Sequence, residues 1–344
     1  MKTQSKFAPW FIIVAFIGLA LVWMQSSTTP PTHAENAAVP EASPVPWYLK
    51  GNNIGANNYL GTKNDQPLVF KVNKQRALKL EPNSTSPNII GGYKDNSVTS
   101  GAYGATVGGG GRNGSTNRVT DDYGTVGGGM NNQAGDNAGT TSDTVGATVG
   151  GGASNTAGEL YATVSGGGSN TASNAFATVG GGFVNSATGL VATVPGGEYG
   201  SASHYGEMAY ASGKFVNSGD AQTSVYILRN TTTDAGTTEL FLDGIDDRLT
   251  VASGRRFTFD ILVIGSAEAG ATAGYHIRGV IKNIGSALAF VGAPAVTTLG
   301  EDDASWNVDV NLNNLFDALI IHVNGTANTT VRWVATVRTA EVAW

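Results

Sequence analysis

Small apolar residues recur at regular intervals through the middle third of the chain. Between residues 90 and 200 a phrase close to Ala-Thr-Val-Gly-Gly-Gly-x-x-Asn-x-Ala occurs seven times. A fixed period with one small apolar residue per unit predicts a stack of coils. The last four of these apolar residues are 15 positions apart, and the whole set is Ile90, Val107, Val126, Val149, Val164, Val179 and Val194.

Each copy of the phrase predicts one coil of a parallel β-solenoid. Consecutive glycines disfavour a helix, whereas they permit the positive-φ corners that a coil requires. Asparagine tolerates left-handed backbone and can stack its amides from coil to coil. The asparagines expected in this role lie six positions after the apolar residue, at Asn113, Asn132, Asn155, Asn170 and Asn185. We therefore expect about seven coils over residues 88–204.

Two gaps interrupt the period. The spacing widens to 19 residues between Val107 and Val126, and to 23 between Val126 and Val149. The extra residues are expected around Gly114–Asp122 and Gly135–Asp143, as polar loops that protrude from one face. The simplest interpretation of these loops is tolerated insertion.

Strict alternation of apolar and polar residues begins after Tyr205. It is clearest at residues 257–264, 306–312 and 331–337, with no helical period. Asn324-Gly325 between two apolar runs indicates a hairpin. The pattern predicts an antiparallel, jelly-roll-like β-sandwich over 205–344, and a shorter alternating stretch predicts an N-terminal β cap over 47–87.

The N-terminus predicts export. Lys2 and Lys6 precede an uncharged run, Phe7 to Met24, and Thr32-His33-Ala34 offers small residues at a cleavage site. Residues 1–34 are therefore expected to be a signal peptide, followed by a linker over 35–46. An uncleaved anchor is the alternative, and it would be the chain's one membrane contact. Either way the remainder is expected outside the cell or on its surface.

Composition and charge exclude several classes of function and of site. Glycine supplies 48 of 344 residues, 13% are charged, and the formal net charge is −6, which argues against nucleic-acid binding. The absence of cysteine excludes disulfides and thiolate metal sites. Each coil offers only valine, alanine and threonine to a core, which is too little to offset the entropy of ordering it. We therefore expect a homotrimer.

No catalytic, cofactor or metal site stands out, and the chain is expected not to be an enzyme. The glycine strings lack the context of a phosphate loop, and no aspartate recurs as in calcium-binding β-rolls. The remaining candidates are better explained as turn acids, as histidines without metal-like spacing (His276 and His322 within alternating strands) and as packing tryptophans than as sites. They are Asp243, Asp246, Asp247, Glu301, Asp302, Asp303, His204, His276, His322, Trp306 and Trp333.

The repeated phrase resembles the left-handed β-roll head repeats of trimeric autotransporter adhesins. The segment WYLKGNNIGANNYLGTKNDQPLVFKVNKQRALKLEP (47–82) is similar to a leader of bacterial cell-surface and fibre proteins, and 210–244 with 329–342 resembles C-terminal domains of phage tail-fibre-like proteins. The resemblance implies a homotrimeric fibre that presents a binding tip.

The first functional expectation is a non-enzymatic, adhesin-like extracellular fibre. In it the β-roll is a rigid spacer, and the domain 205–344 caps it or binds a surface glycan or protein receptor. A phage- or prophage-type tail-fibre receptor-binding protein is one alternative. A glycan-degrading spike is another, and it would need a pair of carboxylates facing a cleft.

Overall fold

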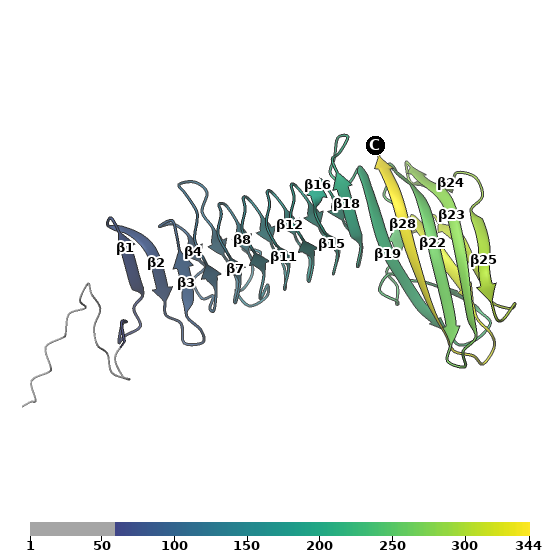
Figure 1. Ribbon diagram of the computed structural model, residues 1–344, viewed down its shortest axis with the longest axis horizontal. Coiled ribbons are helices and arrows are strands. Elements are labelled where there is room, and N and C mark those ends of the chain that lie inside the picture. The colour runs from purple at the N-terminus through teal and green to yellow at the C-terminus, as the bar shows by residue number, and fades with distance from the viewer. Residues whose placement is uncertain (1–58) are drawn as a thin grey trace, which may run out of the picture. The chain divides into compact units, whose positions relative to one another are not determined.

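The computed structural model describes residues 59–344, which form an all-β unit (Figure 1). Within this range there is no helix, and hence none that could cross a membrane. The expected signal peptide 1–34, the linker 35–46 and the first part of the cap lie outside the described residues.

An antiparallel hairpin precedes the coils. Strands β1 (Leu68–Val72) and β2 (Gln75–Glu81) meet at a turn in which Asn73 and Lys74 have φ of 46° and 63°. Strand β2 pairs with β3 (Asn88–Gly91), and β3 pairs in parallel with the next coil. The hairpin therefore covers the first edge of the solenoid, which would otherwise present unpaired backbone groups.

The coils form a parallel β-solenoid of about eight turns, which confirms the predicted fold. Two-residue strands stack in two columns, and in all but β4 the second residue is buried. The first column continues from β3 through β5 (Thr106–Val107), β7 (Thr125–Val126), β9 (Thr148–Val149), β11 (Thr163–Val164), β13 (Thr178–Val179) and β15 (Thr193–Val194). The second contains β4 (Ser97–Val98), β6 (Arg118–Val119), β8 (Gln133–Ala134), β10 (Thr156–Ala157), β12 (Thr171–Ala172), β14 (Ser186–Ala187) and β17 (Ser201–Ala202).

The apolar residues that define the period form a narrow core. Ile90 is 2% exposed, and the six valines are fully buried: Val107, Val126, Val149, Val164, Val179 and Val194. Alanines of the second column complete the same cluster. Backbone hydrogen bonds tie each coil to the next, as from Thr148 N to Ala162 O at 2.9 Å.

A ladder of buried asparagine amides runs up the solenoid. Asn170 shows the pattern: its Nδ2 donates to Gly166 O and Gly182 O at 2.9 and 3.0 Å, and its Oδ1 accepts from Asn185 N at 2.9 Å. The same arrangement includes Asn132, Asn155 and Asn185.

The prediction for Asn113 is wrong. Asn113 is exposed in a turn closed by a bridge between Arg112 and Ser115, and Asn117 takes the place in the ladder. The extra residues of this coil thus come before the asparagine, so the six-residue offset from Val107 does not hold there.

In the triplet 150–152 the third glycine is required by geometry, and the second is not. Gly152 has φ of +88°, and a Cβ on it would lie 2.0 Å from Gly167 O in the next coil. By contrast, a Cβ on Gly151 would meet no heavy atom within 4 Å. The two neighbours differ only in their place in the corner.

This difference predicts opposite outcomes for two adjacent substitutions. Gly152→Ala should destabilise the fold by more than about 1–2 kcal/mol, because left-handed backbone alone costs that much and the carbonyl overlap adds to it. Gly151→Ala should change stability by less than about 1 kcal/mol, in the stabilising direction. Urea unfolding of both variants measures the difference, and equal losses would contradict the proposed geometry.

Antiparallel sheets follow the solenoid, as predicted. The large sheet contains β18 (Met208–Ser212), β19 (Ala221–Thr232), β28 (Val331–Ala343), β22 (Arg255–Ala267), β23 (Thr272–Ile284), β24 (Ala287–Phe290) and β25 (Ala295–Glu301). A smaller sheet contains β20 (Thr237–Glu239), β21 (Leu249–Thr250), β26 (Asn307–Asn313) and β27 (Ala318–Asn324). Trp306 and Trp333 meet in the core between the sheets, with ring centroids 5.3 Å apart.

The hairpin predicted at Asn324-Gly325 is not formed. Strand β27 pairs with β26, β20 and β21, whereas β28 pairs with β19 and β22. The segment after Asn324 therefore carries the chain from the small sheet to the large one.

The solenoid and the large sheet share one run of hydrogen-bonded strands. Strand β15 pairs in parallel with β18, which also pairs with β16 (Gly197–Glu198), and β18 pairs antiparallel with β19 (Figure 1). The first column of the last coil is therefore continued directly by the C-terminal domain, whereas the second column ends at β17.

Candidate functional site

One corner of the solenoid holds side chains where glycine would fit better. Three residues before the buried apolar residue the backbone is left-handed, and glycine occupies this corner at Gly104, Gly146 and Gly206. Other coils place larger residues there, with φ between 53° and 58°: Tyr123, Tyr161, Phe176 and Val191. Left-handed backbone costs a residue with a Cβ about 1–2 kcal/mol.

Burial does not offset this cost. Tyr123, Tyr161 and Phe176 are 49%, 54% and 49% exposed. Tyr161 and Phe176 stack with ring centroids 5.7 Å apart, and Tyr123 packs edge-on against Tyr103 at 5.1 Å. We call these four residues the aromatic edge. Its rings form two pairs, which are separated by the coil that has Gly146 at this corner. Exposed aromatic rings can stack on flat apolar partners.

A second exposed apolar surface lies on the outer face of the large sheet. Ile227, Leu262, Ile264 and Val334 are 39–54% exposed and come from β19, β22 and β28. Leu262 is opposite Thr336, which is opposite Ile227, and Ile264 is opposite Val334. We call these four residues the aliphatic face. Its lack of aromatic rings distinguishes it from the aromatic edge.

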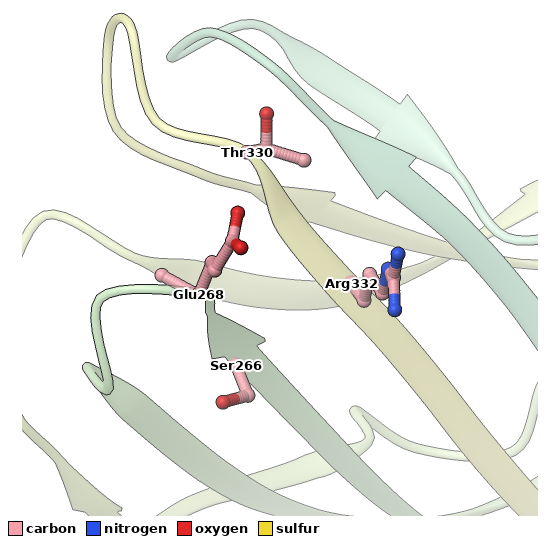
Figure 2. A pocket seen from close by; sticks show the side chains of 5 residues that line it. Ser266, Glu268, Thr330 and Arg332 are labelled. Carbon is pink, nitrogen blue, oxygen red and sulfur yellow. The ribbon is translucent and has the colours of Figure 1, made fainter.

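A pocket of about 360 Å³ lies beside the ends of β22 and β28. Figure 2 shows Glu268, just after β22, and Arg332, on β28, with Ser266 and Thr330 near them. The lining residues supply one carboxylate and one guanidinium. Paired-carboxylate hydrolysis needs two acids, which this pocket does not supply.

The acidic residues considered from the sequence lie in turns, except Glu301, which ends β25 and accepts from Tyr275 OH at 3.1 Å. Asp243 Oδ1 accepts from the backbone N–H groups of Ile245, Asp246 and Asp247 at 2.9–3.0 Å. Although burial raises the pKa of Asp243, these hydrogen bonds lower it below its ordinary value. Asp303 is similar, since bonds from Thr326 and Ser305 lower its pKa. The carboxylates of Asp243 and Asp303 thus stabilise their own turns through hydrogen bonds.

A buried polar network joins the last coil to the C-terminal domain, and its centre was missed from the sequence. Glu207 is 1% exposed and accepts from Ser203 N, His204 N, Ser224 Oγ and Tyr226 OH at 2.8–3.1 Å. It stands where the other copies of the phrase have a buried alanine, for example Ala162, Ala177 and Ala192. A charged residue at this place in the period is the sequence signal that could have identified the buried network.

His204 links both sides of this network. Its Nδ1 lies 3.0 Å from Glu207 Oε2, and its Nε2 lies 3.0 Å from Thr250 O. Burial lowers the pKa of His204, but the hydrogen bond and charge of Glu207 raise it overall. Burial raises the pKa of Glu207, and its bonds with His204 lower it overall. Each partner therefore favours the charged form of the other inside the junction.

A second carboxylate completes the network. Glu341 is 7% exposed, pairs with Arg255, and lies 3.3 Å from the Tyr226 OH that also contacts Glu207. Because both carboxylates are buried, they hold the junction together and cannot reach an extended substrate. Burial, followed by the charges of Glu207 and Glu341, raises the pKa of Tyr226 well above its ordinary value.

No protein-family model matches the chain, and no curated protein matches it. Solved structures of phage tailspikes are similar in part. A tailspike from Acinetobacter baumannii bacteriophage Fri1, described as a capsular polysaccharide depolymerase, is 10% identical over 75% of this chain and 49% of its own, with a TM-score of 0.21. A tailspike from Acinetobacter baumannii phage AM24 is 9% identical over 78% of this chain and 60% of its own, with a TM-score of 0.20.

The chain therefore spans about half to three-fifths of the length of these tailspikes. A β-solenoid followed by antiparallel sheets fits a tail-fibre-like fold, and no family match supports the autotransporter-adhesin resemblance. The expectation that the chain is not an enzyme is contradicted by the Fri1 protein, which is described as a depolymerase. At these TM-scores the likeness assigns no activity to this chain and identifies no catalytic residue.

Proposed function

We propose that this chain is an extracellular spike- or fibre-type protein that acts as a homotrimer and binds surface polysaccharide through its aromatic edge. One observation carries the proposal. Tyr123, Tyr161 and Phe176 occupy left-handed positions that glycine fills elsewhere, and yet they remain about half exposed. Strain without burial points to a role in contacts outside the chain.

A polysaccharide suits this edge for chemical reasons. Sugar rings have apolar C–H faces and polar rims, so they match aromatic faces accompanied by hydroxyl groups, which Tyr103, Tyr123 and Tyr161 supply. The rings form two pairs along the coil stack, Tyr103–Tyr123 and Tyr161–Phe176, so a chain of repeating sugars could contact both pairs. Three copies would multiply a weak single contact by avidity. An adhesin-like fibre and a phage-type fibre would both use such an edge.

The aliphatic face supports the homotrimer. Its side chains are exposed on one face of the large sheet and lack the rings that stack on sugars. An exposed apolar patch of this kind marks a protein contact, and identical chains related by symmetry can cover it. The solenoid also supports a homotrimer, because each coil contributes only small residues to the core.

The aromatic edge can be tested with glycine substitutions that should not harm the fold. In residues 35–344, Tyr161→Gly combined with Phe176→Gly restores the residue that other coils use at this corner. We expect the trimer mass to be unchanged and binding to capsular polysaccharides to fall about tenfold or more, since about 1.4 kcal/mol corresponds to tenfold. Phe183→Gly is the matched control, because Phe183 is 47% exposed on the opposite corner and pairs with Gly168 of the preceding coil.

Two results would contradict the proposal. Equal binding by the double variant and the Phe183→Gly control would show that the aromatic edge does not bind the polysaccharide. A monomeric mass in sedimentation equilibrium would show that the chain does not form a homotrimer. Assaying the same mixtures for new reducing ends shows whether bound polysaccharide is also cleaved.

A further inference from the structure

The coils that break the 15-residue period bring three aspartates together. Asp121 precedes β7, and Asp136 and Asp143 belong to the loop between β8 and β9. One carboxylate oxygen from each lies within 4.8 Å of the others. The cluster therefore joins the second inserted loop to the coil before it.

Asp121 is the buried member of this cluster. It is 1% exposed, and its Oδ2 accepts from Thr120 Oγ1 at 2.7 Å and from Asp136 N at 3.2 Å. Its Oδ1 is buried and has no hydrogen-bond partner. A carboxylate oxygen removed from water without a partner is costly, so this oxygen indicates a missing ligand.

Nothing in the described part of the chain balances the charge. Within residues 59–344, no lysine, arginine or histidine forms an ion pair with Asp121, Asp136 or Asp143. Three carboxylates at this distance repel one another unless a proton or a cation intervenes. Asp143 is exposed and Asp136 is half-buried, so the cluster is open to a solute on one side.

We propose that Asp121, Asp136 and Asp143 bind a calcium ion that fastens the 135–146 loop to the preceding coil. The site is separate from the aromatic edge and does not depend on the proposed function. It arises from the second inserted loop and the coil before it, and not from the repeat, which carries no recurring aspartate.

The donor set favours calcium over other common cations. All three ligands are carboxylates, whereas zinc sites prefer nitrogen and sulfur. Oxygens bound to calcium at about 2.3–2.6 Å can lie about 5 Å apart across the ion, so oxygens within 4.8 Å of one another can share one calcium ion. Magnesium, at about 2.0–2.1 Å, would require a tighter octahedron. Waters and backbone oxygens can complete the shell on the exposed side of Asp143.

The loop is already folded around the cluster. Asp136 Oδ1 accepts from Ala138 N at 2.8 Å, Asp143 Oδ2 accepts from Thr140 N at 3.2 Å, and Asp122 N donates to Thr141 O at 2.7 Å. The ligands are thus held near one another before the ion arrives. Binding to a preformed site stabilises the folded state by mass action.

Calcium titration of the purified chain tests this site. In calorimetry we expect binding with a Kd of about 10⁻⁴–10⁻³ M, the range of extracellular calcium modules. The midpoint of thermal unfolding should be higher in calcium than in EDTA or in equimolar magnesium. Asp143→Asn and Asp136→Asn should each weaken binding by about tenfold or more, since ligand charge sets affinity. Asp246→Asn, an exposed acid in the C-terminal domain, should bind as the wild type does.

Two outcomes would overturn the proposal. One is the absence of binding heat and of any thermal shift at about 10 mM Ca²⁺, ten times the weakest expected Kd. The other is an Asp143→Asn variant that responds to calcium as fully as Asp246→Asn does. Asp143 is exposed, so its substitution should leave the fold intact. If Asp121 is instead balanced by a proton, Asp121→Asn will retain wild-type stability in EDTA and calcium will have no effect on either protein.

Discussion

Replacing Glu207 with alanine is expected to lower the free energy of unfolding by about 3–5 kcal/mol, as when one partner of a buried ion pair is removed. The carboxylate accepts bonds from both sides of the junction, including Ser224 Oγ at 2.8 Å and Tyr226 OH at 3.1 Å. Without it, these donors and the His204 ring lose their acceptor in a buried place. The loss should therefore appear as separation of the last coil from the large sheet.

Chemical unfolding followed by tryptophan fluorescence measures this change, because Trp306 and Trp333 lie in the core of the C-terminal domain. Glu159→Ala is the control: Glu159 is a half-buried acid of an earlier coil. A Glu207→Ala variant as stable as this control would show that the network contributes nothing to the junction.

The pH dependence of the junction follows from the two pKa shifts. The pKa of His204 is raised above 6.5, so its contribution is complete below that pH and is lost as pH rises through the folded-state pKa. The pKa of Glu207 is lowered below 4.5, so its contribution is present above that pH and is lost as pH falls through the folded-state value. The stability difference between wild type and His204→Gln should therefore be largest between pH 4.5 and 6.5.

The solenoid could be predicted from the sequence because its structure is local. One buried valine per coil, such as Val164, together with a corner glycine such as Gly167, specifies both the inward side and the turn. Each coil then stacks on its neighbour in the same register, with Val149, Val164 and Val179 aligned. No long-range choice has to be made.

Where the pattern leaves such a choice open, prediction fails. The 19-residue gap is compatible with several places for the insertion, so the six-residue offset predicts Asn113, whereas Asn117 occupies the ladder. Asn324-Gly325 satisfies a local hairpin rule, yet the burial of both flanking strands in different sheets decides their pairing. A spacing rule cannot supply this information.

The candidate sites were less predictable still. The strain at Tyr161 depends on a backbone angle that its sequence neighbours do not reveal. Asp121, Asp136 and Asp143 are brought together only when the inserted loop folds back. Glu207 was accessible in principle, because a charge replaces a buried alanine of the phrase, but its partners Ser224 and Tyr226 come from another domain.

The asparagine ladder should respond strongly to a single substitution. Asn170→Ala is expected to lower the free energy of unfolding by about 2–4 kcal/mol, because buried backbone groups left without partners cost about 1–3 kcal/mol each. Asn185 N loses its acceptor, and Gly166 O and Gly182 O lose a donor. Asn113→Ala is the matched control: the same residue type in the same solenoid, but exposed in a turn.

Asn170→Asp separates the hydrogen bonds from the volume of the side chain. The carboxylate can still accept from Asn185 N, but it faces the two carbonyl oxygens of Gly166 and Gly182 without a donor. Its protonated form restores one donor, so this variant should gain stability relative to wild type as pH falls toward the raised folded-state pKa of the new acid. Equal losses for Asn170→Ala and Asn113→Ala, or an Asn170→Asp variant with the pH profile of the wild type, would show that the ladder does not hold the coils together. We expect neither result, because Asn170 Nδ2 lies between the carbonyl oxygens of Gly166 and Gly182 and donates to both.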